Sequence, residues 1–400
     1  MKILLYPPEE LMEHLKAFEP LLSKRQFKHL ANYLTGLMAS QRKTIRSIAK
    51  SCLGGGDQSS LNRFLHSKAW RPEDLNQILL QKALEGLFLK EGSILLLILD
   101  DSLLEKFGRC MELVGYLYSP KDRKSILCHD IVTSHLLTED GEDYPVDLRL
   151  YARKEQCRKA GKTFKSRVDL AVELIRAFQP PKGVEVIVLM DAWYFCKHVV
   201  DAIRARGWHY ISEAKSNRIV YHDGSRNRLD EMPLKLRDMF RDVETGGDLY
   251  AAFKVQVEIP KIGLTTLLMK SKLQKKRDPI HFLVSDLLEW SSSQLIETFR
   301  KRHKIDEFYR EANQNLGLDG YMVRSAYASN RHWRLVFLAY ALLVLLRRGI
   351  AFLSGKTIGE LCEWVHEKCV EGFASWLYRL FKAGASLEEA LKGLNQTAKL

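Results

Sequence analysis

The chain has 400 residues, 46% of them hydrophobic and 10% aromatic, which suits a globular protein with a sizeable core and argues against disorder. Its 62 lysines and arginines exceed its 49 aspartates and glutamates, and the formal net charge of +13 favours a polyanionic partner such as nucleic acid. Seven cysteines without a C-x-x-C pair argue against a disulfide framework or a zinc knuckle and favour a reducing cytoplasm. The longest apolar run, 335–346, is shorter than the roughly 20 residues that a membrane span needs, so we expect a buried core helix and no membrane segment.

The N-terminal region is helical and basic. A helix with Ile45 and Ile48 on its apolar face is followed by a Gly-Gly-Gly turn at 54–56 and by a second helix that Ser59 or Ser60 would cap. Two short helices joined by a glycine turn resemble a helix-turn-helix, although a helical bundle with a solvated basic face fits the pattern equally well. The expected DNA contacts are Arg42, Lys43 and Arg46 on the first helix and Arg63 on the second.

Two aspartate positions follow strand-like apolar runs. The run 94–99 precedes Asp100 and Asp101, which we expect at the end of a central strand, and two further strands joined by the turn PKDRKS predict an antiparallel meander. The segment 184–212 predicts a β-α-β unit with Asp191 at the carboxyl end of its first strand, where open α/β sheets bind their ligands. A helix N-cap is the alternative role for Asp191. Trp193 is expected to pack in the core, with base stacking as the alternative.

The later part of the chain changes character twice. Residues 217–285 form short β-like runs, and the basic run at 274–278 is expected to be a solvated turn with DNA contact as a second role. From 291 onward the pattern is helical and includes Asp306 and Glu307 in basic surroundings. A solvated helix face with an i,i+4 pair between Arg302 and Asp306 is the simplest reading of that segment taken alone.

Together the three acidic positions suggest a shared chemistry. Carboxylates that converge from rigid elements can hold two divalent ions for phosphoryl transfer. Hard oxygen ligands favour Mg²⁺ or Mn²⁺ over softer metals.

The stretches ILDDSLLEKFG, VIVLMDAWY and RHKIDEFYREANQNLGLDGYMVRS, in this order and spacing, resemble insertion-sequence transposases of the DDE superfamily, close to the IS-four and IS-seven-hundred-and-one groups. The resemblance covers most of the chain. It implies an α/β fold with a ribonuclease-H-like catalytic core, a mixed sheet with flanking helices, interrupted by a β-rich insertion and joined to helical N- and C-terminal regions. It also implies cutting and rejoining of double-stranded DNA with two Mg²⁺ or Mn²⁺ ions, without a covalent enzyme intermediate.

The family motifs assign roles to individual residues. The first motif, Asp, one residue, then Thr or Ser, matches 100–102 and makes Asp100 the first metal ligand. Asp101 remains an alternative, because neighbouring residues on a strand point to opposite faces. The second motif makes Asp191 the second ligand.

The third motif reads Tyr, two residues, Arg, three residues, Glu, six residues, Lys on one helix, and it corresponds here to Phe299, Arg302, Asp306 and Asn313. Asp306 is thus the expected third ligand. Glu307 is the alternative, because Asp is one methylene shorter than Glu and metal sites tolerate little misplacement. Arg302, Arg310 and Asn313 are the expected DNA contacts on this helix.

The resemblance divides the chain into a helical DNA-binding region at 1–90, a first part of the catalytic core at 91–216, an insertion at 217–285, the rest of the core at 286–325 and a helical region at 326–400. The expected protein is a DNA transposase that acts as a homodimer on paired transposon ends in a bacterial or archaeal cytoplasm. Two alternatives are a nuclease of the same fold without strand transfer and, because of the exchanges at 299, 306 and 313, a decayed copy that binds DNA without cutting it.

Overall fold

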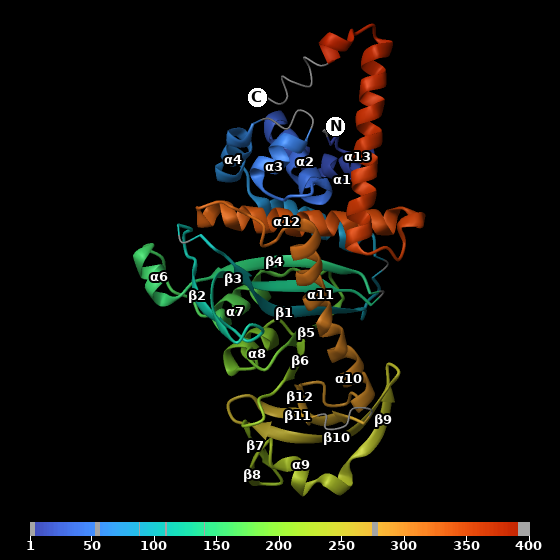
Figure 1. Ribbon diagram of the computed structural model, residues 1–400. Helices are drawn as coiled ribbons and strands as arrows, with labels where there is room; N and C mark the ends of the chain where they lie inside the picture. Colours follow the sequence, from blue (N-terminus) through green and yellow to red (C-terminus); the bar gives the residue numbers. More distant parts are fainter. Residues whose placement is uncertain are drawn as a thin grey trace.

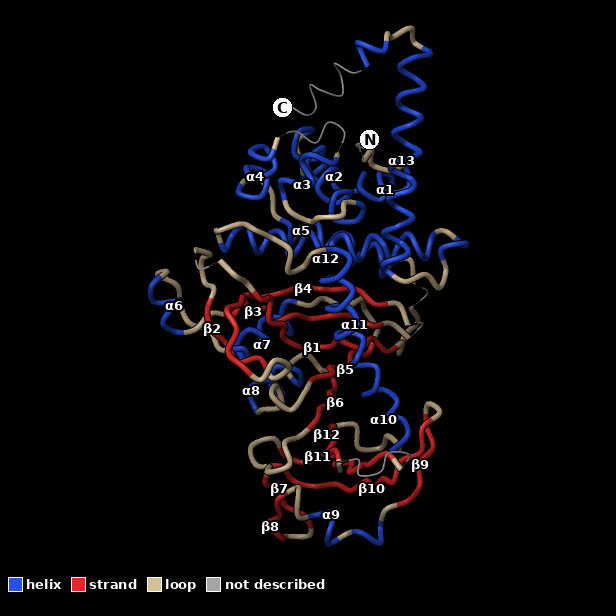
Figure 2. Tube along the Cα trace, viewed as in Figure 1, coloured by secondary structure: helices blue, strands red, loops and turns tan. Residues whose placement is uncertain are grey.

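The computed structural model describes residues 5–52, 57–87, 89–108, 110–139, 141–273 and 279–390. A single sheet runs through this part of the chain, with helices on both faces (Figures 1 and 2). Its strand order is β2-β3-β1-β5-β6-β12-β11-β10-β7-β8, with β4 paired to β3 and β9 paired to β10. The first six strands along the chain are β1 (Ile94–Glu105), β2 (Gly115–Ser119), β3 (Lys124–Leu137), β4 (Asp143–Tyr151), β5 (Glu185–Met190) and β6 (His209–Glu213).

The central strand is β1, which lies between an antiparallel neighbour and a parallel one. It pairs antiparallel with β3 and parallel with β5, and β5 pairs parallel with β6. The parallel strands are joined through α7 (Arg167–Ala177) and α8 (Lys197–Arg204), which pack on one face of the sheet. This mixed sheet with flanking helices confirms the predicted fold class.

The expected meander is present, but β1 is longer than the sequence suggested. β2 and β3 are antiparallel, with Ser119 opposite Lys124 across the turn. The prediction that Asp100 and Asp101 lie at the end of the strand was wrong, because β1 continues through both aspartates to Glu105 and pairs with β3 along that extension. Hydrogen bonds to β3 therefore replace the loop that the two polar residues suggested.

The β-rich segment at 217–285 lengthens the same sheet. Its strands in the described residues are β7 (Ile219–His222), β8 (Ser225–Arg228), β9 (Arg241–Thr245), β10 (Asp248–Ile259), β11 (Gly263–Lys272) and β12 (His281–Ser285). β12 pairs antiparallel with β6, which joins the segment to the strands β1–β6. A short helix, α9 (Met232–Lys235), lies between β8 and β9. The basic run at 274–278 lies outside the described residues.

Residues 9–85 contribute helices to the described structure. These are α1 (Glu9–Leu15), α2 (Lys24–Ala39), α3 (Ile45–Ser51), α4 (Gln58–His66) and α5 (Pro72–Glu85). Two details of the predicted helix pair were wrong. Arg42 and Lys43 precede α3, whose N-cap is Thr44, and α4 is capped by Asp57, whose carboxylate accepts the Ser60 N–H at 2.6 Å. The predicted glycine turn at 54–56 lies outside the described residues.

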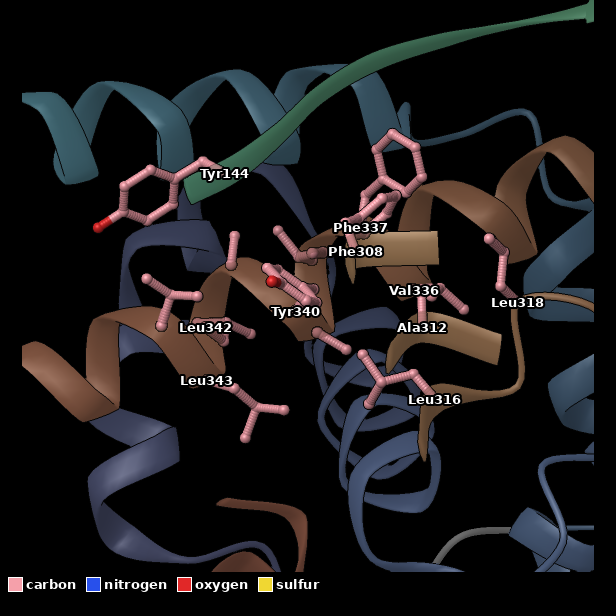
Figure 3. Packing of buried hydrophobic residues seen from close by; sticks show 14 of the residues in the cluster. Tyr144, Phe308, Ala312, Leu316, Leu318, Val336, Phe337, Tyr340, Leu342 and Leu343 are labelled. Atoms are coloured by element: carbon pink, nitrogen blue, oxygen red, sulfur yellow. The ribbon is translucent and has the colours of Figure 1, made fainter. Parts of the chain in front are cut away.

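The C-terminal part is helical, as expected. It contains α10 (Ser292–Arg300), α11 (Lys304–Glu311), α12 (Ala326–Gly349) and α13 (Ile358–Lys382). Figure 1 shows α12 between the sheet and the N-terminal helices, and most of its side chains are buried. Phe308 of α11 packs edge-to-face on Phe337 and Tyr340 of α12 (Figure 3). None of the helices in the described ranges is long and apolar enough to cross a membrane.

Candidate active site

The two aspartates of the first motif lie on opposite faces of β1. Leu96 and Ile98 belong to the core beneath α11, whereas Leu97 and Leu99 belong to the core beneath α7 and α8. Because side chains alternate along a strand, Asp100 continues the first series and Asp101 the second. Asp100 therefore faces the helix that carries the third motif.

Asp100 is bound by an arginine of that motif. Arg302 Nη1 donates a hydrogen bond of 2.9 Å to Asp100 Oδ2, and the Asp101 N–H donates one of 2.8 Å to Asp100 Oδ1. Burial raises the pKa of Asp100 to about 7, and the nearby carboxylates of Asp101 and Asp191 add to the rise while Arg302 opposes it. The Arg302 guanidinium therefore offsets part of the negative charge around Asp100.

Asp191 follows β5 directly, in a turn. Its Oδ1 accepts N–H bonds of 2.9 Å from Trp193 and 3.3 Å from Tyr194. The helix N-cap reading was wrong, because α8 begins at Lys197 and its N-cap residue is Cys196. Trp193 was expected to pack in the core and does not, since its side chain is 54% exposed with the Lys215 ammonium over its ring.

The third motif lies on an irregular helical run. α10 and α11 are separated by a 3-10 turn at Lys301–His303, and a π-helical turn at Ala312–Leu316 follows α11. The single regular helix assumed for this motif is thus interrupted twice. π-helical turns are rare and are often found at functional sites. The run is fixed over the site by Tyr309, whose hydroxyl bonds to Thr133, the β3 residue opposite Asp100.

Asp306 and Glu307 have different surroundings. Asp306 is exposed and lies within electrostatic reach of Arg302, whose other acidic neighbours are Asp100 and Asp191. Glu307 is held on the helix surface by His303 at 3.1 Å and Lys304 at 2.7 Å. Arg302 is therefore hydrogen-bonded to Asp100 and lies within electrostatic reach of Asp191 and Asp306, whereas Glu307 is paired with residues of its own helix run.

Sequence reasoning missed a second network on the other face of β1. Asp101 Oδ1 accepts a 2.7 Å hydrogen bond from the Tyr194 hydroxyl, and Arg167 lies 3.4 Å from Asp101 Oδ2 and bonds to Asp130. Asp130 is fully buried in β3, and burial together with the Asp101 charge raises its pKa to about 8 against the opposing effect of Arg167. The signal was an acid inside the mostly apolar stretch ILCHDIV.

The predicted DNA contacts differ in their exposure. Arg42, Arg46, Arg63 and Arg310 are exposed. Lys43 is half-buried, its ammonium donates to the Met38 carbonyl at 3.2 Å, and burial lowers its pKa to about 8. Asn313 is also half-buried, and its Oδ1 is enclosed without a hydrogen-bond partner in the described structure. The exposed arginines are therefore better placed than Lys43 to contact a polyanion.

The carboxylates suit a divalent cation chemically, because they supply hard oxygen donors and an excess of negative charge. Within the described residues, however, no three acidic, histidine or cysteine side chains lie close enough to form a metal site. Asp100 is mostly buried and Asp191 is half-buried, and Asp306 would have to move inward from the exposed face of α11 to join them.

Comparison with known families identifies the superfamily of the chain. The model of the DDE superfamily endonucleases matches residues 13–233, and the model of the transposase DDE domain matches residues 129–342. No curated protein matches the chain. The chain belongs to the DDE superfamily of transposases. The family carries out DNA transposition at a DDE catalytic core and generally uses divalent metal ions.

Proposed function

We propose that this protein cuts DNA at transposon ends and joins the resulting 3′ hydroxyl to target DNA by two-metal-ion phosphoryl transfer at Asp100, Asp191 and Asp306. The observation that carries the proposal is the Arg302 cluster. Arg302 is hydrogen-bonded to the carboxylate of a central strand and lies within electrostatic reach of two others, one in the turn after a parallel strand and one on a late helix. Folding alone does not require acids from three separate elements to lie near one another, since each could be solvated by itself.

The residues of the cluster divide into two tasks. Asp100, Asp191 and Asp306 would hold Mg²⁺ or Mn²⁺, which activates the attacking water or hydroxyl and stabilises the leaving oxygen. Arg302 and the exposed Arg310 would hold the DNA phosphate by charge-assisted hydrogen bonds, and Asn313 is included as a further contact. The exposed ring of Trp193, two residues after Asp191, is placed to stack on a base beside the cut.

Asp306 is the better third ligand on these contacts. Glu307 would have to give up two ion pairs with residues of its own helix run, whereas Asp306 is exposed and lies near the arginine that binds Asp100. Adjacent helical residues diverge by about 100°, so both acids cannot face the same ion.

The N-terminal helices are proposed to bind the transposon end. A cleft of about 550 Å³ separates α3 and α4 from residues 322–325. Asn62 and His66 of α4 line it with Arg46 and Arg324, so amide and imidazole groups lie beside two cations. Amide side chains read adenine edges in the major groove and arginines bind phosphates, which suits α4 as the recognition helix.

Assembly and location complete the proposal. Joining two transposon ends in one reaction requires two active sites, so we expect a homodimer on paired ends. The substrate is chromosomal DNA, which places the protein in a bacterial or archaeal cytoplasm with the nucleoid.

The test uses DNA that carries the element's own ends, taken from the flanks of its gene, with Mg²⁺ or Mn²⁺. Wild-type protein is compared with the single variants Asp100→Asn, Asp101→Asn, Asp191→Asn, Asp306→Asn and Glu307→Gln, each checked for folding and DNA binding. The proposal expects cleavage and strand transfer to be lost at 100, 191 and 306 with binding retained. Cleavage without strand transfer would indicate the nuclease alternative.

A second candidate is a copy that binds DNA without cutting it. It is favoured by the absence of a three-ligand metal cluster in the described residues and by the exchanges at 299, 306 and 313. It predicts salt-sensitive DNA binding that Asp100→Asn and Asp191→Asn leave unchanged, and no nicking by the wild type in either metal.

A further inference from the structure

The β2–β3 hairpin extends beyond the rest of the sheet as a two-stranded ribbon. β3 pairs with β2 from Lys124 to Cys128, whereas its pairing with β1 begins at Cys128 and its pairing with β4 begins at Asp130. Among the described residues, those at 124–127 of β3 therefore pair with β2 as their one strand partner, and the Lys106 N–H donates to the Leu127 carbonyl at 2.7 Å at the base of the ribbon. An isolated two-stranded ribbon is only marginally stable in water, so its base must be anchored by the sheet. The ribbon lies at the side of the sheet where α6 (Lys154–Lys159) is labelled in Figure 1.

Two tyrosines project from this ribbon. Tyr116 is 49% exposed and Tyr118 is 62% exposed, at alternate positions of β2 and therefore on one face. They lie opposite Leu127 and Ser125, just as Asp100 lies opposite Thr133. Residues 125, 127 and 133 of β3 are separated by even numbers of positions, so their side chains lie on one face of the sheet. Directly opposed residues on paired strands share a face as well. The tyrosines are thus on the same sheet face as the Asp100 carboxylate.

The tip of the ribbon is basic and conformationally strained. Lys121, Arg123 and Lys124 are exposed, and none of them forms an ion pair within the described part of the chain. The one acid of the tip, Asp122, accepts a hydrogen bond of 2.7 Å from the Ser119 hydroxyl. Arg123 has φ 52°, in the left-handed region that favours glycine or asparagine. The turn thus carries a cation where turn chemistry alone would favour a residue without charge.

We infer that this ribbon docks in a groove of the duplex that is being cut, about six to nine base pairs from the scissile phosphate. The major groove of B-DNA admits a two-stranded β-ribbon, tyrosine hydroxyls bind phosphates, and the free cations of the tip complement the DNA charge. Leu127 and Lys124 lie six and nine positions from Thr133 along β3. This is roughly 20–30 Å at a strand rise of about 3.3 Å, and DNA rises about 3.4 Å per base pair. The inference rests on the proposed function for the position of the cut.

The experiment measures binding and protection of a duplex with the element's terminal sequence, taken from the flanks of its gene. Arg123→Gly removes a charge and relieves the strained backbone, so the variant should fold at least as stably as the wild type. We expect roughly three- to tenfold weaker binding and a salt slope smaller by about 0.9 for the lost phosphate contact. Tyr116→Ala with Tyr118→Ala should remove hydroxyl-radical protection six to nine base pairs from the cut.

The chain offers matched controls on another hairpin. Lys261, between β10 and β11, is also an exposed cation with positive φ, at 68°, so Lys261→Gly changes the same charge and relieves the same strain. Tyr221 on β7 is 41% exposed, and Tyr221→Ala removes a comparable ring. Both controls should leave affinity, salt slope and protection unchanged.

The outcomes separate this inference from the proposed function. Equal weakening by Arg123→Gly and Lys261→Gly would overturn it, because the effect would then be one of net charge. Unchanged DNA binding and unchanged hydroxyl-radical protection in the ribbon variants would also overturn it. The lysines of the tip would then serve to prevent edge-to-edge aggregation of the strand. A wild type that binds but never cuts would contradict the proposed function, while the affinity and salt comparisons of the ribbon would still be informative.

Discussion

Arg302 and Asp100 form a hydrogen-bonded ion pair of 2.9 Å between a late helical turn and the central strand. Both side chains are mostly buried, at 21% and 17% exposure, so their charges are weakly screened. Because Asp100 also lies near two other carboxylates, the pair decides how much uncompensated negative charge the site contains.

Removing the arginine should destabilise the protein through that charge. Arg302→Ala leaves Asp100 buried beside Asp101 and Asp191 without its hydrogen-bonded cation, and we expect a loss of about 1–3 kcal/mol in the free energy of unfolding. Asp100→Asn in the same protein should restore most of it. Chemical denaturation of the two single variants and the double variant measures this coupling, and additive effects would contradict it.

The two acids of α11 should differ in their effect on cleavage. Asp306→Asn removes a proposed ligand, and a contribution of about 3 kcal/mol to the transition state would correspond to a loss of about a hundredfold in rate. Glu307→Gln removes surface ion pairs with His303 and Lys304 and should change the rate by less than about threefold. Single-turnover cleavage of end DNA measures both, and the reverse order would make Glu307 the ligand.

The N-terminal cations should separate into DNA contacts and a structural residue. Arg46→Ala and Arg63→Ala remove exposed charges, so each should weaken DNA binding and reduce the salt slope by about 0.9 if it contacts one phosphate. Lys43→Ala removes a half-buried stem and the bond to the Met38 carbonyl, so it should lower stability with little change in salt slope. Binding isotherms at several salt concentrations, with thermal melts of each variant, provide the comparison.

Two buried histidines predict a pH-dependent loss of stability. His332 accepts from the Tyr33 hydroxyl and donates to the Gly317 carbonyl, a pairing that only the neutral ring can make. Burial lowers the pKa of His332 to about 4, and burial also lowers the pKa of His129 to about 4. Between about pH 6.5 and 4 the unfolded chain binds these protons and the native protein does not, so the two histidines contribute a loss of stability as the pH drops. The raised pKa values of Asp100 and Asp130 act in the opposite direction in the same window, so the histidine contribution is read from the difference between wild type and variant.

Each histidine should contribute about 3 kcal/mol to that loss, from the difference between an unfolded pKa of about 6.5 and the lowered native value. His332→Gln should flatten the dependence, whereas His66→Gln on the exposed face of α4 should not. Urea denaturation at pH 4.5 to 7.5 measures it, and an equal pH dependence of stability in the wild type and His332→Gln would contradict the neutral assignment.

Gly36 of α2 should not tolerate alanine. An added Cβ would lie 2.5 Å from Ile48 Cγ2 of α3, closer than side chains can approach. Alanine favours a helix over glycine by about 1 kcal/mol, but overpacking typically costs about 1–3 kcal/mol, so the clash should prevail. We expect Gly36→Ala to lower the melting temperature and Ile48→Ala to restore part of it in the double variant. An unchanged or higher melting temperature for Gly36→Ala would show that α3 can shift.

Local pattern was sufficient for much of the fold. Hydrophobic periodicity can be read from consecutive residues. It was therefore possible to recognise the apolar run before Asp100, the β-α-β pattern around Asp191 and the apolar segment within α12. The order and spacing of three short motifs were also sufficient for the superfamily, which the matches over 13–233 and 129–342 support.

The sequence by itself determined which acids could act together, and tertiary structure decided how they are arranged. The extension of β1 past Asp100 depends on pairing with β3, and the burial of Asp130 depends on neighbours that are distant along the chain. The exposure of Trp193 and the ion pairs of Glu307 likewise depend on packing and geometry. Hydrogen-bond partners and desolvation are properties of three-dimensional neighbours, so they set the pKa of Asp100 and the isolation of Glu307 in ways that no local pattern encodes.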